Sequence, residues 1–329
     1  MRAGVSPSTV SNYLNKSAPV NLNTAKRIAG AIDKLRYTPD NIARGLRIGK
    51  TKTIGLILPD ISNPFYSVLV NGMEEIATKN DYTIVLACNN YDYDREKRQV
   101  NNLVNNHISG FIFGTGGIDI NEIKKIQKRG IPVVVVDRKI ADKKVPSVEV
   151  DNFKAVYDGI KYLVDNGHKN IYYFTEPITM GTLKDRLNGY REALIDSGIG
   201  VNEAKVMINK EFQTKKTQMG YMIMSRLLSK IKIPAAVFAT SDLIAFGAMR
   251  ASLEFGFKVP DEISFLGYDN IFLSEFMNPP LTTIKQPKKN MGRVAMQLLI
   301  DLIMDKKVKQ KRILLNTKLI ERATVKKLI

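Results

Sequence analysis

The sequence predicts an α/β protein in which a small all-helical unit precedes two doubly wound α/β lobes. Residues 1–48 show only short helical patterns, whereas from Thr53 onward apolar runs alternate with amphipathic segments. Continuous apolar strands separated by helices indicate parallel sheets that are covered on both faces. The alternation spans about 250 residues, more than one such sheet needs, so we expect two lobes.

The helical unit opens with a well-marked start. Ser6 suits the N-cap of a helix and Pro7 its first position, where the missing N–H costs nothing. Val10, Tyr13 and Leu14 then fall on one face. These positions predict a helix that begins at Pro7.

Two further helical segments are predicted before the lobes. One runs from about Asn23 to Leu35, with Ile28, Ile32 and Leu35 on its inward face. The other is a short segment at residues 41–46 that leads into a linker at residues 49–52. The linker separates the helical unit from the first strand.

The two lobes are predicted from alternating strands and helices. The expected strands are Ile54–Leu58, Tyr82–Leu86, Gly110–Phe113, Ile131–Val136, Ile171–Phe174, Ala235–Ala239 and Ile263–Gly267. The expected helices between them include Ser67–Asn80, Arg95–Asn106, Ala155–Asn166 and Ile244–Phe255. No low-complexity tract interrupts this order.

Charge is concentrated at the two ends of the chain. The net charge is +18 over 329 residues. Residues 1–52 carry +8 and residues 305–329 carry +7, which leaves only +3 for the long middle part. A basic N-terminal unit on a nearly neutral body indicates a module that binds a polyanion, although a lysine-rich surface alone would give the same count.

Composition excludes several classes of protein. The single Cys rules out an internal disulfide and a cysteine-rich metal site. No apolar run approaches the roughly 20 residues of a membrane span. We therefore expect a cytoplasmic protein without membrane contact, metal or cofactor. No catalytic constellation is recognisable either, so we do not expect an enzyme.

Polar and aromatic residues recur just after the predicted strands. In open α/β sheets ligands bind beyond the carboxyl ends of the strands. The residues found there are residues 60–66, Asp137, Arg138, residues 240–242 and residues 268–270. A lone Asp in such a place is usually a turn residue, but several converging strand ends favour a binding cleft.

Four segments of the sequence resemble those of a known protein family. The segments GVSPSTVSNYLN, KRIAGAIDKLRYTPDNIARGLRIGKTKTIGLILPDISNPFY, ISFLGYDN and LTTIKQP occur in the order typical of bacterial transcription regulators of the lactose/galactose repressor (LacI/GalR) family. The resemblance covers essentially the whole chain. It implies a helix-turn-helix DNA-binding headpiece followed by two doubly wound lobes of the periplasmic-binding-protein type.

The resemblance also implies domain boundaries. The partial helix-turn-helix headpiece would occupy residues 1–40, with a hinge helix and linker at 41–52. The N-lobe would comprise residues 53–151 and 286–306, and the C-lobe residues 152–285 and 307–329. The family has a further helix before Ala3-Gly4, and here only Met1 and Arg2 stand there. We interpret this as a late start assignment, with a shortened chain or a loss of DNA binding as alternatives.

The family pattern assigns DNA contacts to the segment from Ser6 to Asn15. Pro7, Ser8 and Asn12 match positions that touch base edges in the major groove. Asn12 stands where the family commonly has Arg. Asn suits a pair of hydrogen bonds with adenine, whereas Arg suits guanine, so we expect the operator to differ at that base. Phosphate contacts are implied for Ser6, Thr9, Ser11 and Asn15, whose alternative role is ordinary capping and surface polarity.

The hinge segment resembles a helix that folds when two subunits meet on DNA. Leu46 matches a leucine that wedges into the minor groove, Ala43 allows close approach and Arg44 lies near phosphate. Gly45 weakens any free helix, so we expect this segment to order only on DNA. A plain interdomain linker would explain the glycine but not the apolar Leu46 among basic residues.

The resemblance places an effector between the lobes. Phe65 and Tyr66 would stack on a sugar ring, and Asp137 with Arg138 would clamp neighbouring hydroxyls. The remaining matched positions are Arg186, Ser241, Asp269 and Gln286. The set is closest to that of pentose binders, so a carbohydrate is favoured over a purine.

The expected function is therefore a homodimeric repressor of transcription that binds double-stranded operator DNA and responds to a small molecule, favoured to be a sugar or sugar derivative. Two alternatives remain open. Some relatives answer to a phosphorylated carrier protein, and a shortened headpiece would leave a sugar-binding protein without DNA binding. Neither an export signal nor an acid/base pair supports a transport protein or an enzyme.

Overall fold

The computed structural model describes residues 3–15, 18–35, 51–114, 120–140, 142, 144–209 and 214–328. The chain divides into two compact units, one ending at Thr51 and the other beginning at Lys52.

The first unit contains the helices α1 (Pro7–Asn15) and α2 (Leu22–Leu35). The N-cap role of Ser6 is confirmed, because its Oγ accepts a hydrogen bond from the Thr9 backbone N–H at 3.2 Å. Ile28 is buried as expected. Leu35 is not an inward residue, since it ends the helix and is 50% exposed. The short segment at residues 41–46 lies outside the described residues.

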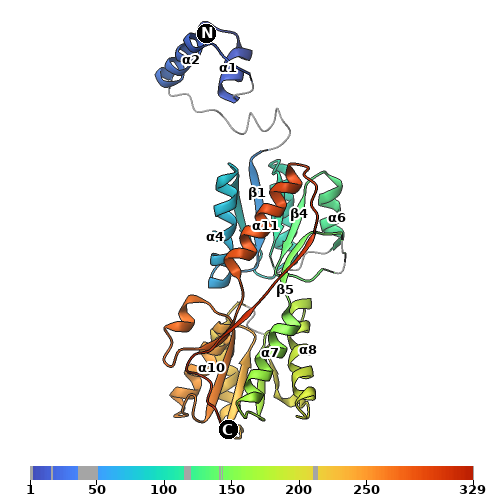
Figure 1. Cartoon of the computed structure of the whole chain (residues 1–329), viewed down its shortest axis with the longest axis vertical. Helices are drawn as coiled ribbons and strands as arrows, with labels where there is room; N and C mark the ends of the chain where they lie inside the picture. The colour runs from blue at the N-terminus through green and yellow to red at the C-terminus, as the bar shows by residue number, and fades with distance from the viewer. Residues whose placement is uncertain are drawn as a thin grey trace. The chain divides into compact units, whose positions relative to one another are not determined.

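The second unit consists of two lobes, each with its own sheet (Figure 1). Among the described residues the N-lobe sheet has six strands in the order β11-β5-β4-β3-β1-β2. Its strands are β1 (Thr53–Leu58), β2 (Thr83–Cys88), β3 (Gly110–Phe113), β4 (Val133–Val136), β5 (Ser147–Val150) and β11 (Arg312–Leu315). Its helices are α4 (Pro64–Lys79), α5 (Tyr93–Asn105), α6 (Ile120–Lys128) and α11 (Lys288–Ile303).

The C-lobe repeats this arrangement. The part of the chain that the structure describes gives its sheet the order β12-β10-β9-β8-β6-β7, with only β10 and β12 antiparallel. Its strands are β6 (Ile171–Thr175), β7 (Val206–Ile208), β8 (Ala235–Ala239), β9 (Ile263–Asp269), β10 (Thr282–Lys285) and β12 (Lys318–Ile320). Its helices are α7 (Asn152–Asp165), α8 (Gly181–Asp196), α9 (Lys216–Leu228) and α10 (Asp242–Glu254), with short 3-10 turns η1 (Glu203–Lys205) and η2 (Phe272–Glu275).

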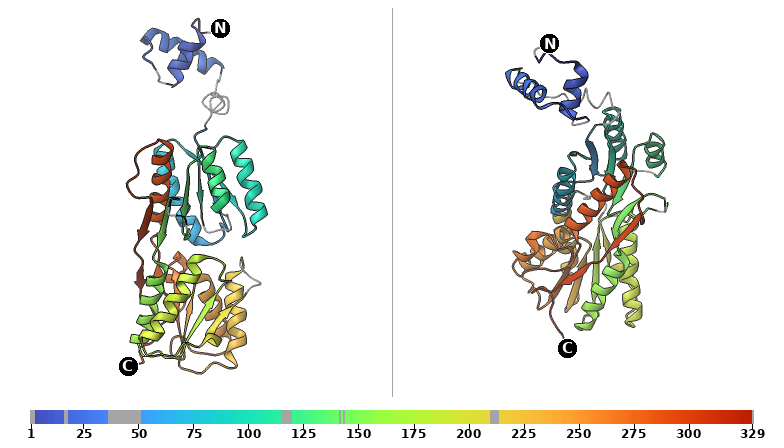
Figure 2. Two further views of the ribbon diagram at one scale, coloured as in Figure 1. Left: turned by 90° about the vertical axis from the view of Figure 1, so that its right-hand side faces the viewer. Right: turned by 45° about the horizontal axis from the view of Figure 1, so that its top comes forward.

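Helices cover both faces of each sheet (Figure 2). In the N-lobe, alternate residues of one strand point to opposite layers: Leu56 packs in the cluster that includes α4 and α11, whereas Ile57 packs with α5 and α6. The C-lobe does the same, with α9 and α10 on one face and α7 and α8 on the other. The predicted class of two doubly wound α/β lobes is confirmed.

One domain boundary differs from the expectation. We expected the chain to cross into the C-lobe near Lys306, but β11 pairs with β5 in the N-lobe sheet, from Arg312 opposite Ser147 to Leu315 opposite Val150. The crossing therefore lies between Leu315 and Lys318. The expectation failed because β11 is short and directly follows the basic run at residues 306–311, so its apolar residues do not stand out in the sequence. Those lysines form an exposed connection from α11 to β11.

Among the described residues of both units, no helix is long enough and apolar enough to span a bilayer.

Candidate functional site

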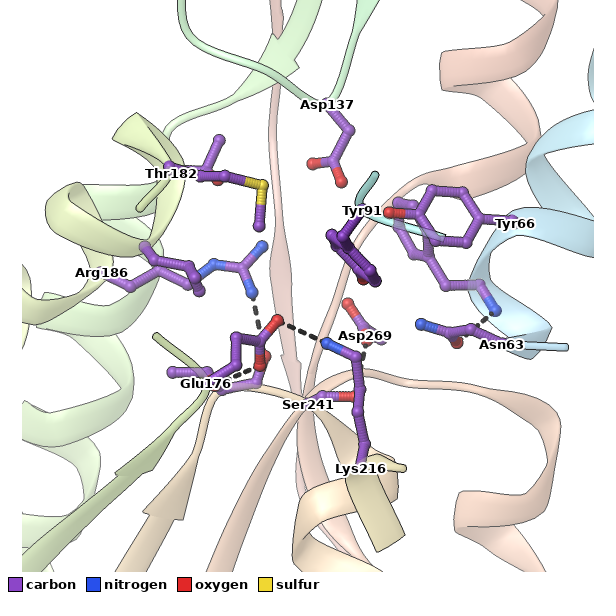
Figure 3. A pocket seen from close by; sticks show the side chains of 14 residues that line it. Asn63, Tyr66, Tyr91, Asp137, Glu176, Thr182, Arg186, Lys216, Ser241 and Asp269 are labelled. Carbon is purple, nitrogen blue, oxygen red and sulfur yellow. Dashed lines mark hydrogen bonds and ion pairs between the residues drawn. The ribbon is translucent and has the colours of Figure 1, made fainter. Parts of the chain in front are cut away.

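A small cavity lies between the two lobes, at the carboxyl ends of both sheets (Figure 3). Its volume is about 30 Å³. The residues that line it are Asn63, Phe65, Tyr66, Tyr91, Asp137, Glu176, Met180, Thr182, Leu183, Arg186, Lys216, Thr240, Ser241 and Asp269. Both lobes contribute, so the cavity is a shared site.

The start of α4 supplies the aromatic wall. Asn63 is the N-cap of this helix, and its Oδ1 accepts a hydrogen bond from the Phe65 N–H at 3.0 Å. Pro64 occupies the first helical position, where proline is favoured. The rings of Phe65 and Tyr66 then meet edge to face with centroids 5.0 Å apart. The sequence Asn-Pro-Phe-Tyr thus fixes two apolar ring surfaces at the cavity.

Asp137 follows β4 directly and is almost fully buried. Its φ of 54° lies in the left-handed region, which aspartate adopts more readily than most residues. Burial raises the pKa of its carboxyl group to about 7, assisted by the Asp269 charge and opposed by Arg186 and Lys216. Among the described residues no group donates to its Oδ1. This oxygen is therefore available to a hydroxyl of a bound molecule.

Arg186 projects from α8 and is held in a fixed orientation. Its Nε donates to Asn152 Oδ1 at 2.7 Å, and one Nη donates to the Thr240 carbonyl at 2.9 Å. The guanidinium also stacks 3.8 Å from the ring centroid of Tyr268. The planar cation is thus presented to the cavity without freedom to rotate.

A buried ion pair of Glu176 and Lys216 forms another wall. Glu176 follows β6 and Lys216 begins α9, so both are C-lobe residues (Figure 3). Burial raises the pKa of the Glu176 carboxyl, but the charge of Lys216 and its hydrogen bond outweigh burial and hold that pKa below its ordinary value. Sequence reasoning missed this pair.

Asp269 ends β9 and is anchored on both carboxylate oxygens. Ser241 donates to its Oδ2 at 3.3 Å and Gln286 Nε2 donates to its Oδ1 at 2.9 Å. Burial raises the pKa of Asp269, which the nearby Arg186 and the Gln286 hydrogen bond oppose. The carboxylate is thereby fixed in place beside the cavity.

The structure brings together six of the eight residues that the sequence placed in the effector site, namely Phe65, Tyr66, Asp137, Arg186, Ser241 and Asp269. Gln286 lies behind Asp269 and does not line the cavity. Arg138 does not line it either. Its charge acts on Glu96 of α5, where it counteracts the pKa rise caused by burial.

The lining residues absent from the prediction had partial signals. Asn63 and Thr240 lie in the segments after strands that the sequence singled out, and Glu176 also directly follows a strand. Tyr91 lies after β2 and Lys216 at the start of a helix, where no pattern distinguished them from surface residues.

The predicted DNA-contacting residues lie on and before α1. Ser6, Pro7 and Ser8 are exposed, and Thr9, Ser11 and Asn12 are partly exposed. The hydroxyl groups of Ser6 and Thr9 also form a hydrogen bond at 2.8 Å, so part of the hydrogen-bonding capacity of Ser6 is used at the start of the helix. The side chain of Asn15 and the segment with Ala43, Arg44 and Leu46 lie outside the described residues.

A helical unit joined to a two-lobed core with a polar cavity between the lobes defines a ligand-controlled DNA-binding regulator. Family comparison agrees: residues 1–40 match "Bacterial regulatory proteins, lacI family", and residues 51–323 match "Periplasmic binding proteins and sugar binding domain of LacI family". The chain belongs to the LacI family. It is a transcriptional regulator of the repressor type and not an enzyme.

Individual relatives support the assignment. Catabolite control protein A of Priestia megaterium is 34% identical over 303 residues, which cover 90% of this chain and 89% of the relative. The lac repressor dimer bound to operator and the anti-inducer ONPF has a TM-score of 0.85 and 25% identity, over 99% of this chain and 97% of that chain. A LacI family regulator from Enterococcus faecium with bound ribose has a TM-score of 0.75 and 30% identity, over 84% of this chain and all of that chain.

Proposed function

We propose that the protein is a cytoplasmic homodimer that represses transcription by binding double-stranded operator DNA, and that a sugar or sugar derivative in the interlobe cavity controls its operator affinity. The observation that carries this proposal is the cavity itself. It combines the ring surfaces of Phe65 and Tyr66 with fixed polar groups from both lobes.

The chemistry of the cavity fits a polyhydroxy ligand. Aromatic faces pack against the C–H surface of a sugar ring, while carboxylates and a guanidinium bond adjacent hydroxyls. The two cations of the lining, Lys216 and Arg186, are balanced by the carboxyl groups of Glu176 and Asp269, so the site offers no excess of positive charge to a strongly anionic ligand. The bound ribose of the Enterococcus faecium relative supports the pentose class.

The size of the cavity supports a role for lobe movement. A volume of about 30 Å³ is far below the roughly 300 Å³ at which pockets begin to enclose small molecules, so a sugar can enter only if the lobes move apart. Ligand occupancy and lobe closure are then coupled. The effector changes operator affinity to the extent that it binds one lobe arrangement better than the other.

For DNA we propose the surface of α1. Pro7, Ser8 and Asn12 would read base edges, and Ser6, Thr9, Ser11 and Asn15 would contact phosphates. Leu46 would wedge into the minor groove, where Ala43 would allow close approach and Arg44 would lie near phosphate. These assignments rest on the family resemblance and on the exposure of Ser6, Pro7 and Ser8 at the start of α1.

The test begins with selection of duplexes from a random library by the full-length chain. We expect enrichment of a near-palindromic site, a steep loss of affinity with rising salt, and a shift in affinity when D-ribose or another pentose is added. The matched control is Arg186→Met, which should bind the selected duplex without responding to the sugar. Failure to enrich any duplex would disprove the DNA-binding proposal, and an unchanged affinity across a panel of pentoses and hexoses would disprove the sugar proposal.

A further inference from the structure

Lys288 is a buried cation that the proposed function leaves unexplained. It is the first residue of α11, immediately after the chain crosses from β10 of the C-lobe, and its side chain is buried. The positive end of the helix dipole lies at this position, so a cation there is unfavourable for the helix. Burial also lowers the pKa of its ammonium group, although the charges of Asp269 and Asp242 oppose the shift.

The contacts of Lys288 show what compensates this cost. Its Nζ donates to the backbone carbonyls of Asp269 and Asn270, the latter at 2.8 Å. Both residues have left-handed φ values, 113° and 50°. A turn of this kind points successive carbonyls outward from the strand end, and a cation that donates several hydrogen bonds can satisfy both. Lys288 thus fixes the backbone that carries the cavity residue Asp269.

The same turn is anchored from the C-lobe by other groups. Asp242 of α10 accepts from the Ile271 N–H at 2.8 Å, and Arg322 donates to Asn270 Oδ1 at 2.9 Å. Lys288 differs from these because its helix belongs to the N-lobe. The Cβ of an alanine at Gly292 of α11 would lie 2.0 Å from the Leu69 carbonyl of α4, so the two helices pack backbone to backbone and α11 moves with the N-lobe.

We propose that Lys288 is a positioning residue that straps the cavity turn at Asp269–Asn270 to helix α11, so that a change at the cavity reaches the N-lobe through its ammonium group. Gln286 reinforces the strap, because it holds the side chain of Asp269 from the same crossover. The proposal deepens the function above and rests on the cavity being the effector site.

The test uses the full chain without DNA or effector, so its outcome is independent of whether operator or sugar binding is observed. Lys288→Met removes the ammonium group at nearly the same length. Lys288→Gln is the second variant in case the first does not fold. The matched control is Lys285→Met, which removes an exposed cation three residues earlier on the same crossover.

The first measurement is amide hydrogen exchange. Loss of charged hydrogen bonds of this kind corresponds to about a tenfold rise in local opening, so the amides of Asn270 and Ile271 should exchange about tenfold faster in the Lys288 variants. Amides of β8 should not change, and neither should any amide of this turn in the control. Unchanged exchange at the turn would overturn the positioning role.

The second measurement is the distance between spin labels placed on exposed positions of opposite lobes, Lys97 on α5 and Lys184 on α8, in a Cys88→Ser background. We expect a broader interlobe distance distribution for the Lys288 variants and the wild-type distribution for Lys285→Met. Faster exchange at the turn with an unchanged interlobe distribution would leave Lys288 as a local anchor and overturn its role as an interlobe strap.

Discussion

The Glu176 carboxylate and the Lys216 ammonium are paired inside the interlobe cavity, with side chains only 8% and 10% exposed. Two charges at such a depth depend on one another. The desolvation of each is tolerated only because the other is present. This dependence gives the first prediction.

Lys216→Met should destabilise the second unit by about 3–5 kcal/mol, because it leaves the Glu176 carboxylate buried without a counter-ion. The double variant Lys216→Met/Glu176→Gln should recover a large part of that loss. Urea unfolding of the four members of the cycle measures the coupling. If the free-energy changes of the two single variants simply add in the double variant, the interaction between Glu176 and Lys216 contributes nothing to stability.

The raised pKa of Asp137 predicts a dependence of stability on pH. The folded protein keeps this proton up to about pH 7, whereas the unfolded chain loses it near pH 4. Between these values the folded state binds more protons, so the contribution of Asp137 to stability falls as pH rises, by at most about 1.4 kcal/mol per pH unit. Asp137→Asn removes this contribution.

The measurement is the free energy of unfolding of Asp137→Asn and of the wild type at pH 5 and pH 8. The variant should gain stability relative to the wild type at the higher pH. Asp242 is also buried and has a pKa raised to about 7, so only the difference between the two proteins reports on Asp137. A difference that does not vary with pH would contradict the assigned cause.

Arg186→Lys should lose about 1–3 kcal/mol of stability although the charge is retained. An ammonium group cannot reach Asn152 and the Thr240 carbonyl together while stacking on Tyr268. Arg191→Lys is the control, because Arg191 pairs with Glu203 at the surface, where such pairs contribute about 0–1 kcal/mol. Thermal unfolding of both variants should therefore separate them clearly, and similar losses would argue against the buried network.

Gly292→Ala should destabilise the protein by at least about 1–3 kcal/mol, since its Cβ would meet the Leu69 carbonyl of α4 and the two helices would have to separate. Gly200→Ala provides the comparison. A Cβ at Gly200 meets nothing within 4 Å, and the substitution should change stability by no more than about 0.5 kcal/mol. Chemical unfolding of the two variants tests the contrast.

The sequence predicts the buried strands well because burial on both faces demands continuous apolar residues. The bounds of β3 and β8 agree with those predicted from Gly110 and Ala235 onward. The strands that escaped prediction, such as β5 and β11, lie at the edge or crossover of a sheet. There polar residues such as Glu149 and Arg312 pair with one another, and the apolar run is too short to stand out.

The candidate site was predictable only in part, for a geometric reason. The end of a parallel strand identifies which backbone positions face the cavity, and this led to Asp137 and Asp269. It does not fix the direction of the next side chain, and Arg138, which directly follows Asp137, does not line the cavity. Partners brought together from distant elements, such as Glu176 and Lys216, require the tertiary arrangement.

In the part of the chain that the structure describes, the backbone passes between the two sheets three times, after Val150, after Lys285 and after Leu315. Three short tethers side by side act mechanically as a flexure. They permit bending about the line that joins them and resist twisting or sliding of one lobe over the other. A regulator with this joint can convert occupancy of a small cavity into one reproducible rotation, and a single broken tether would loosen that rotation without releasing either lobe.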